Sequence, residues 1–147
     1  MNKSAARKRP AARSRKLLKL VVRALDDKKA EDLQVLDVRD QSSITDYLVL
    51  ATGTSEPHLR ALRTELEKAL EGARVPIIGV ETTPGSGWTV FDAFEIMVHL
   101  FTAENRAKYR LELLWRDASR FPVDVLLAGQ APARRDSAAT RRRKKAD

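Results

Sequence analysis

An uninterrupted apolar run from Tyr47 to Thr52 constrains the fold more than any other segment of the chain. A run of this kind is typical of a β-strand that is buried on both faces. A glycine breaks the run, and Pro57 then suits the first turn of a helix that Ser55 or Glu56 can cap. The segment therefore predicts a central strand that leads directly into a helix.

The helix after this strand is expected to pack on the sheet, because it carries a single apolar stripe. The stripe consists of Leu59, Leu62, Leu66 and Leu70. Residues 75–80 are predicted as the next strand, although Pro76 weakens it and places it near an edge of the sheet. A strand, a helix and a strand in this order require parallel strands joined by a right-handed crossover.

Apolar periodicity predicts the remaining elements. Residues 16–28 are predicted as an amphipathic helix, because four apolar side chains fall on one face: Leu18, Val21, Val22 and Leu25. Three further strands are expected at 33–38, 88–92 and 95–101, and a last helix at 103–118. The resulting order, α-β-β-α-β-β-β-α, predicts an α/β (α+β) fold with a mixed five-stranded sheet packed by helices.

Charge divides the chain into three parts. Of the net charge of +8, residues 1–16 contribute seven basic side chains and no acidic one, and residues 130–147 contribute seven basic and two acidic ones. The part between them is therefore mildly acidic, with a net charge of −4. Since the terminal segments are poor in apolar bulk, we predict a disordered basic extension at 1–15, one domain at 16–128 and a disordered basic tail at 129–147.

The basic segments have two interpretations. They are either solvated tails without a ligand, or tails that bind RNA phosphates in a salt-sensitive and sequence-blind way. Neither contains an aromatic residue on which a base could stack, so recognition of single-stranded RNA is not indicated.

The predicted location is the cytoplasm. The chain contains no cysteine, which fits a reducing compartment, and its apolar runs are far shorter than the ~20 residues of a membrane span. The arginine-rich N-terminal stretch is compatible with an organelle transit peptide, but a basic extension is the simpler interpretation.

Two features of the sequence are candidate sites of chemistry. The turn after the central strand could bind a phosphate at the start of the helix, or it could be an ordinary strand-to-helix turn. Nucleotidyltransferases place a similar turn before a pair of metal-binding aspartates. This chain has no Asp-x-Asp, and Asp92 and Glu95 lie across an expected turn. We therefore predict no catalytic residue, no metal site and no cofactor.

The strand at 95–101 alternates in a way that singles out one face. Ile96, Val98 and Leu100 share one side, while Met97, His99 and Phe101 share the other. The second set, together with Trp88, Val90 and Phe94, is either core beneath a helix or a protein-binding surface. The sequence leaves both possibilities open.

The chain resembles the ribosome silencing factor (Iojap-like, RsfS) family over residues 17–118. The resemblance rests on several fragments in a fixed order: Lys29-Ala30, Leu36-Asp37-Val38, Ile44-Thr45-Asp46-Tyr47, Thr52-Gly53, Trp88 with Asp92, Val98-His99, Arg106, and Tyr109-x-Leu111-Glu112-x-Leu114-Trp115. The chain departs from the family at Thr82, where the family has Gly. It also departs at the turn Asp92-Ala93-Phe94-Glu95, where the family has Asp-Tyr-Gly-Asp.

The resemblance implies a fold related to nucleotidyltransferases without their catalytic acids. It also implies a factor that binds protein number fourteen of the large ribosomal subunit and sterically blocks joining of the small subunit, which lowers translation when nutrients are short. A homodimer of the free protein is a further implication. The domain's net charge of −4 suits a basic ribosomal protein, and the basic tails could add contacts to ribosomal RNA.

We predict that the partner-binding residues lie on the hairpin formed by the strands at 88–92 and 95–101 and at the start of the following helix, because aromatic anchors dominate interface energies. The predicted set is Trp88, Asp92, Phe94, His99, Phe101, Lys108 and Tyr109. Two other classes of function remain as alternatives: a nucleotidyltransferase-related enzyme acting at the Gly53 turn, and an RNA-binding protein working through its tails.

Overall fold

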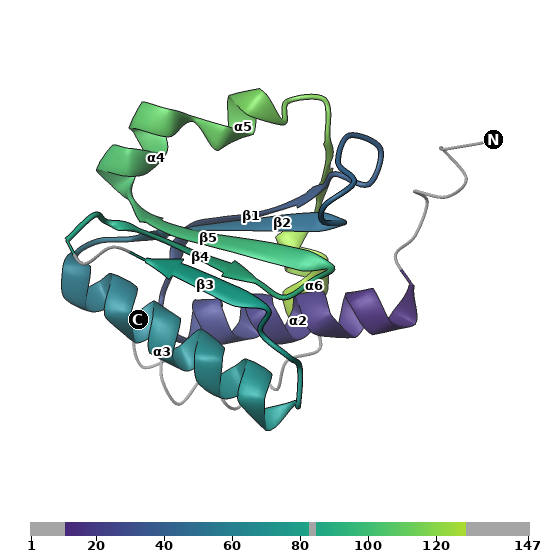
Figure 1. Cartoon of the computed structure of the whole chain (residues 1–147), viewed down its shortest axis with the longest axis horizontal. Coiled ribbons are helices and arrows are strands. Elements are labelled where there is room, and N and C mark those ends of the chain that lie inside the picture. The colour runs from purple at the N-terminus through teal and green to yellow at the C-terminus, as the bar shows by residue number, and fades with distance from the viewer. Residues whose placement is uncertain (1–10, 83–84, 129–147) are drawn as a thin grey trace.

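The computed structural model describes residues 11–82 and 85–128, and its centre is a mixed six-stranded sheet (Figure 1). The order across the sheet is β3-β4-β5-β2-β1-β6. The strands are β1 (Glu31–Asp37), β2 (Tyr47–Gly53), β3 (Gly79–Thr82), β4 (Trp88–Asp92), β5 (Ile96–Thr102) and β6 (Ser119–Phe121). The helices are α2 (Ala12–Asp27), α3 (Glu56–Gly72), α4 (Ala103–Tyr109), α5 (Leu111–Leu114) and α6 (Val123–Leu127).

The helices form layers on both faces of the sheet (Figure 1). Helices α2 and α3 pack beneath it, with α6 beside α2, and they enclose the larger apolar cluster with Val49, Phe91 and Val98. Helices α4 and α5 lie above the other face, where a smaller cluster surrounds Leu50 and Phe101. The α/β class with a mixed sheet is therefore confirmed.

Strand β2 is the central strand that the apolar run predicted. All seven of its residues are buried, and it pairs antiparallel with β1 and parallel with β5. Its connection through α3 to β3 is also parallel, because β3 and β4, and then β4 and β5, pair antiparallel. Strand β3 forms one edge of the sheet, as Pro76 predicted, although it begins at Gly79, four residues after the predicted start at residue 75.

The predicted helix after the central strand is confirmed in detail. Ser55 caps α3 by accepting a hydrogen bond from the backbone N–H of His58, and Pro57 lies in the first turn. All four leucines of the predicted stripe are buried. The cap satisfies a backbone donor that the helix itself leaves open, and the stripe supplies the apolar burial that fixes α3 to the sheet.

The first helix starts earlier than predicted. Helix α2 begins at Ala12, and Ser14 is already buried, so residues 12–15 are helical rather than part of the extension assigned to 1–15. The four apolar residues predicted for its inner face are completely buried. Residues 1–10 and the tail at 129–147 lie outside the described residues.

The predictions of a five-stranded sheet and of a single helix at 103–118 are wrong. A sixth strand, β6, pairs with β1, but three residues are too few to produce a period-2 signal. The helix breaks at Arg110, whose φ of 46° is left-handed, and a separate short helix follows. After the break, Leu114 faces outward, where 71% of its surface is exposed. Helix α6 was also not predicted.

The turn between β4 and β5 holds an aromatic residue in a conformation that suits glycine. Phe94 has φ 73° and is 65% exposed. Its backbone N–H donates a hydrogen bond to Oδ1 of Asp92 at 2.9 Å, and the N–H of Ala93 donates to the carbonyl of Ile96. These bonds keep the turn closed although a left-handed conformation is costly for any residue with a Cβ atom.

Replacing Phe94 by glycine is expected to stabilise the protein. The left-handed penalty of ~1 kcal/mol disappears, and little apolar burial is lost because the ring is exposed. The midpoint of thermal unfolding should rise by about 2–5 °C. Phe94→Ala keeps the Cβ atom and serves as the control. Its midpoint of thermal unfolding should not rise. If the midpoint for Phe94→Gly is at or below that of Phe94→Ala, the left-handed backbone at this position does not destabilise the protein.

Candidate docking surface

Four rings gather where β4, β5 and α4 meet. The ring of Trp88 lies 5.6 Å from that of Phe101, 5.9 Å from that of His99 and 4.7 Å from that of Tyr109, measured between centroids. Register explains the gathering, because Trp88 is paired directly with Phe101, and His99 is two residues before Phe101 on the same face of β5. Four of the seven residues predicted for partner binding are thus brought together.

A hydrogen bond fixes the orientation of the two central rings. The indole Nε1–H of Trp88 donates to Nδ1 of His99 at 3.0 Å. Indole nitrogen is only a donor, so Nδ1 of His99 is unprotonated. Burial disfavours the charged imidazolium and lowers the pKa of His99 to about 4. The surface therefore presents a neutral imidazole near pH 7, held by the tryptophan.

This pKa predicts that the protein loses stability in mild acid. The unfolded chain takes up a proton at His99 as the pH falls below about 6.5, whereas the folded chain does so only near 4. Stability is thus fully present above about pH 6.5 and decreases as the pH falls, by up to about 3 kcal/mol at pH 4.

The measurement is the midpoint of thermal unfolding at pH 7 and pH 4.5 for the wild type and for His99→Gln. The variant lacks the titrating ring, so its midpoint should fall less between the two values. An equal fall in both proteins would show that other groups, such as carboxylates, account for all of the acid sensitivity.

The ring cluster is partly interior and partly surface. Phe101 was expected on the docking surface, but it is 0% exposed. Its ring instead lies beneath that of Trp88 and supports it. Trp88 and His99 are half-buried, and Tyr109 is 48% exposed. Nζ of Lys108 lies 5.3 Å above the ring of Tyr109, so a positive charge borders the rings.

The surface extends along the hairpin to Asp92. Trp88, Val90 and Asp92 alternate with the buried Thr89 and Phe91, so the first three face the same side as the ring cluster. Both Val90 and Asp92 are half-buried. We call the surface formed by Trp88, Val90, Asp92, His99, Lys108 and Tyr109 the hairpin surface.

Phe94 does not belong to the hairpin surface. It lies in the turn between β4 and β5, at the end of the hairpin opposite to Trp88, and it lines a groove together with residues of α2. The sequence had grouped it with the other aromatic residues because the geometry of the turn was not predictable from residues 92–95.

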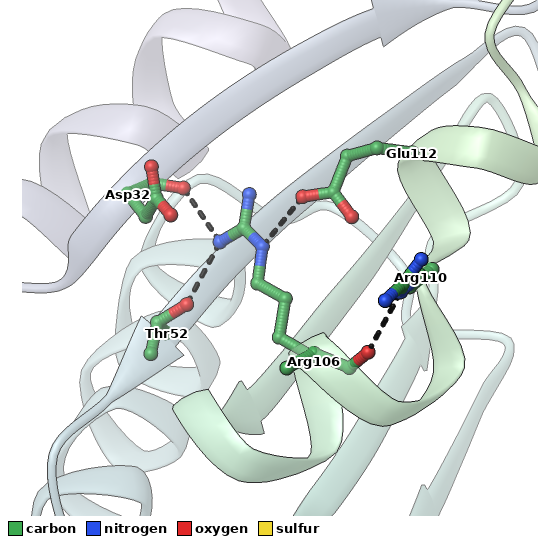
Figure 2. A network of polar contacts seen from close by, with 6 residues as sticks. Asp32, Thr52, Arg106, Arg110 and Glu112 are labelled. Carbon is green, nitrogen blue, oxygen red and sulfur yellow. Dashed lines mark hydrogen bonds and ion pairs between the residues drawn. The ribbon is translucent and has the colours of Figure 1, made fainter.

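Helix α4 is fixed beside the hairpin surface by a buried arginine (Figure 2). Only 6% of Arg106 is exposed. Its Nε atom donates to Oε2 of Glu112 at 2.7 Å, and its Nη1 atom donates to the carbonyl of Asp32 at 2.6 Å and to Oγ1 of Thr52 at 2.8 Å. The guanidinium thus connects α4 to α5, β1 and β2, and it sets where Tyr109 stands.

The sequence interpretation missed two exposed apolar residues and the role of this arginine. Leu113 and Leu114 of α5 are exposed, since the left-handed residue at 110 redirects the helix. Arg106 was noted only as part of a family fragment. A single arginine on a short amphipathic helix gives no signal of burial, because its partners come from distant segments.

The turn after β2 has structural partners for its polar groups. The backbone N–H of Thr54 donates to Nδ1 of His58 at 2.9 Å, so the other ring nitrogen donates to the carbonyl of Lys28 at 2.7 Å. A Cβ atom at Gly53 would lie 2.7 Å from a methyl carbon of Leu59, so the glycine lets α3 approach the sheet. These contacts support the interpretation as an ordinary strand-to-helix turn.

The carboxylates considered for metal binding are separated by their contacts. Asp92 accepts the backbone hydrogen bond of the turn, whereas Oε2 of Glu95 pairs with Arg13 at 2.9 Å. Among residues 11–82 and 85–128, no group of three or more metal-ligating side chains is close enough to hold an ion. In the same part of the chain, no helix is long and apolar enough to cross a membrane.

Comparisons with known proteins agree on one family. Residues 11–147 match the family described as "Ribosomal silencing factor during starvation". A ribosomal silencing factor RsfS of Halalkalibacterium halodurans is 36% identical over 78% of this chain and 98% of its own length. A mouse protein named for mitochondrial assembly of the ribosomal large subunit is 31% identical over 65% of this chain and 43% of its own length.

Solved structures agree as well. A crystal structure of a protein from Chromobacterium violaceum superimposes with a TM-score of 0.67 and 32% identity, covering 69% of this chain and 84% of that one. A crystal structure from Bacillus halodurans gives a TM-score of 0.65 with 33% identity, over 73% of this chain and 97% of that one.

Proposed function

The chain belongs to the ribosomal silencing factor family, and from that premise we propose that it binds the large ribosomal subunit and sterically blocks joining of the small subunit. The proposed contact is protein number fourteen of the large subunit, and the consequence is lower translation under nutrient limitation. The name of the mouse relative, which refers to assembly of the large subunit, supports the choice of subunit.

The observation that carries the proposal is the hairpin surface. It presents a tryptophan held by a hydrogen bond, an exposed tyrosine and a carboxylate, on strands whose other face is packed in the core. Rigid aromatic side chains that are already oriented lose little entropy on binding, and tryptophan and tyrosine are enriched among residues that dominate interface energies. Such a surface is suited to binding a partner protein.

The proposed mechanism needs no chemical step. A steric block requires a stable interface of at least about 1,000 Å² and a bound body that occupies the partner's place. The polar groups of the Gly53 turn and the carboxylates of the 92–95 turn support this mechanism, because each already has a structural partner. The net charge of −4 over residues 17–129 favours fast association with a basic ribosomal protein.

Sedimentation with separated ribosomal subunits tests the proposal. The full chain is expected to migrate with the large subunit in a sucrose gradient and to be absent from the small-subunit fraction. Adding it before the subunits are mixed should reduce the peak of joined ribosomes in proportion to its occupancy. Equal binding to both subunits, or no effect on joining, would contradict the proposal.

We also propose that the folded domain, rather than the tails, carries the specificity. A chain shortened to residues 11–128 keeps all of α2 and is expected to migrate with the large subunit at physiological salt, with weaker binding where tail charges contact RNA phosphates. A synthetic peptide of residues 130–147 is the matched control and should bind naked RNA and both subunits alike. Complete loss of binding by the shortened chain would assign the function to the tails instead.

A further inference from the structure

A second surface lies on the opposite side of the sheet from the hairpin surface. A groove of about 1230 Å³ runs between α2 and the segment 73–78, which leads from α3 to β3, and the 93–95 turn contributes to its lining. Figure 1 shows α2 and α3 together beneath the sheet, whereas α4, which carries Tyr109, lies above it. A partner in this groove therefore leaves the hairpin surface free.

The walls of the groove are apolar and open to solvent. Ile78 is 59% exposed and Phe94 is 65% exposed, while Leu20 and Val75 line the same groove half-buried. Phe94 keeps this place although its backbone is left-handed. Exposed apolar side chains gathered in a concave surface are typical of sites that another molecule covers.

The rim of the groove is strongly basic. Five of the lining residues carry a positive charge: Arg13, Lys16, Lys19, Arg23 and Arg74. The one acidic lining residue, Glu95, is already paired with Arg13. The lining of the groove therefore carries an excess of positive over negative charge.

We propose that this groove binds an acidic amphipathic helix of a partner protein. The volume exceeds the ~300–1,000 Å³ of pockets that take small molecules, and an α-helix about 10 Å in diameter needs a trough of this kind. The apolar side chains of the helix, spaced i, i+3, i+4 and i+7, contact the walls. Its carboxylates pair with the basic side chains of the rim.

Charge and apolar exposure favour this occupant over three others. A second copy in a symmetric dimer would place one basic rim against another. The tail at 130–147 is itself basic and would be repelled. RNA would neutralise the rim, but its sugar-phosphate backbone gives the walls at Leu20, Val75 and Ile78 no apolar contact.

The test uses the full chain and a synthetic probe. The probe is a fluorescein-labelled, helix-stapled peptide of about three turns, with leucine at i, i+3, i+4 and i+7 and glutamate elsewhere. Fluorescence anisotropy should give a dissociation constant in the micromolar range that weakens with added salt. A sister peptide with lysine in place of glutamate is expected to bind at least about tenfold more weakly.

Matched variants of the chain locate the binding. Lys16→Glu with Lys19→Glu, on the rim, should weaken the acidic peptide at least tenfold. Arg60→Glu with Lys68→Glu changes the net charge equally but lies outside the groove, so this variant should bind as the wild type does. Ile78→Ser should also weaken binding, because Ile78 supplies apolar contact and, being exposed, is not needed for folding.

Several outcomes would overturn the proposal. Equal binding of the acidic and basic peptides would show that the charge of the rim does not select the partner. Equal loss of binding in both double variants would show that the peptide does not bind in the groove. Preferential binding of a poly-adenylate oligonucleotide, or a dimer that Lys16→Glu with Lys19→Glu dissociates, would assign another occupant. Sedimentation of the rim variant with the large subunit separates this proposal from the proposed function, because it should be unchanged.

Discussion

Trp88→Ala should weaken binding to the large subunit by about 2 kcal/mol or more, which is a loss of about 30-fold or greater in affinity. The substitution removes the largest ring of the hairpin surface, the hydrogen bond to His99 and the contact that orients Tyr109. The affinity can be measured by titrating labelled protein with purified large subunits and following anisotropy.

Two controls separate a lost contact from a lost fold. Trp88→Phe keeps an aromatic ring on Phe101 but removes the indole N–H, so it should retain part of the affinity. The thermal midpoint of each variant must lie well above the temperature of the binding measurement. Wild-type affinity in a folded Trp88→Ala protein would exclude the hairpin surface as the docking site.

The boundary of the interface is tested by Asp92 and Phe94. Asp92→Ala is expected to lose affinity because truncating one member of a close charge pair costs about 2–5 kcal/mol when the pair is buried on binding. Phe94→Ala should have a small effect, since Phe94 lies in the turn and lines the groove rather than the hairpin surface. A larger effect at Phe94 than at Asp92 would mean that the ribosomal contact extends around the end of the hairpin.

Arg106→Ala is expected to destabilise the protein by about 3 kcal/mol or more, which would lower the thermal midpoint by about 10 °C. The substitution removes hydrogen bonds to Asp32, Thr52 and Glu112, and it leaves a cavity beneath α4 (Figure 2). Thermal unfolding followed by circular dichroism measures the change.

The graded variants show whether geometry or charge matters at this site. Arg106→Lys keeps the charge but lacks the planar fork that reaches three elements, so it should recover only a part of the stability. Glu112→Gln keeps an acceptor for Nε of Arg106 and should cost about 1 kcal/mol. If Arg106→Lys is as stable as the wild type, the fork geometry is not what holds α4.

The elements that the sequence predicted well are those whose signals are local. The apolar run at β2 and the leucine stripe of α3 are read from neighbouring residues, and each was buried as expected. The break at Arg110 and the pairing of β6 with β1 depend on contacts between distant segments, such as the bond from Arg106 to Asp32. Those contacts determine the structure without leaving a periodic pattern.

The candidate site was predictable in its residue types but not in its layering. Alternation in β5 placed Met97, His99 and Phe101 on one face, and the structure confirms this face. Whether a ring on that face is covered depends on where α4 and α5 lie. Their position buries Phe101 and leaves Tyr109 exposed. Phe94 was misplaced because a left-handed turn sends its side chain away from the strand face.

The parallel pairing of β2 with β5 has a consequence for how the chain acquires its structure during synthesis. Each β2 residue pairs with one about fifty positions later, as in Tyr47 with Ile96. Until β5 has left the ribosomal exit tunnel, β2 has β1 on one side and an open edge on the other. Pairings of such long sequence separation are slow to form, and the intermediates that precede them are prone to aggregate. The nascent chain therefore exposes its most apolar strand until its second half is made, and chaperones that bind apolar segments are expected to bind it during that interval.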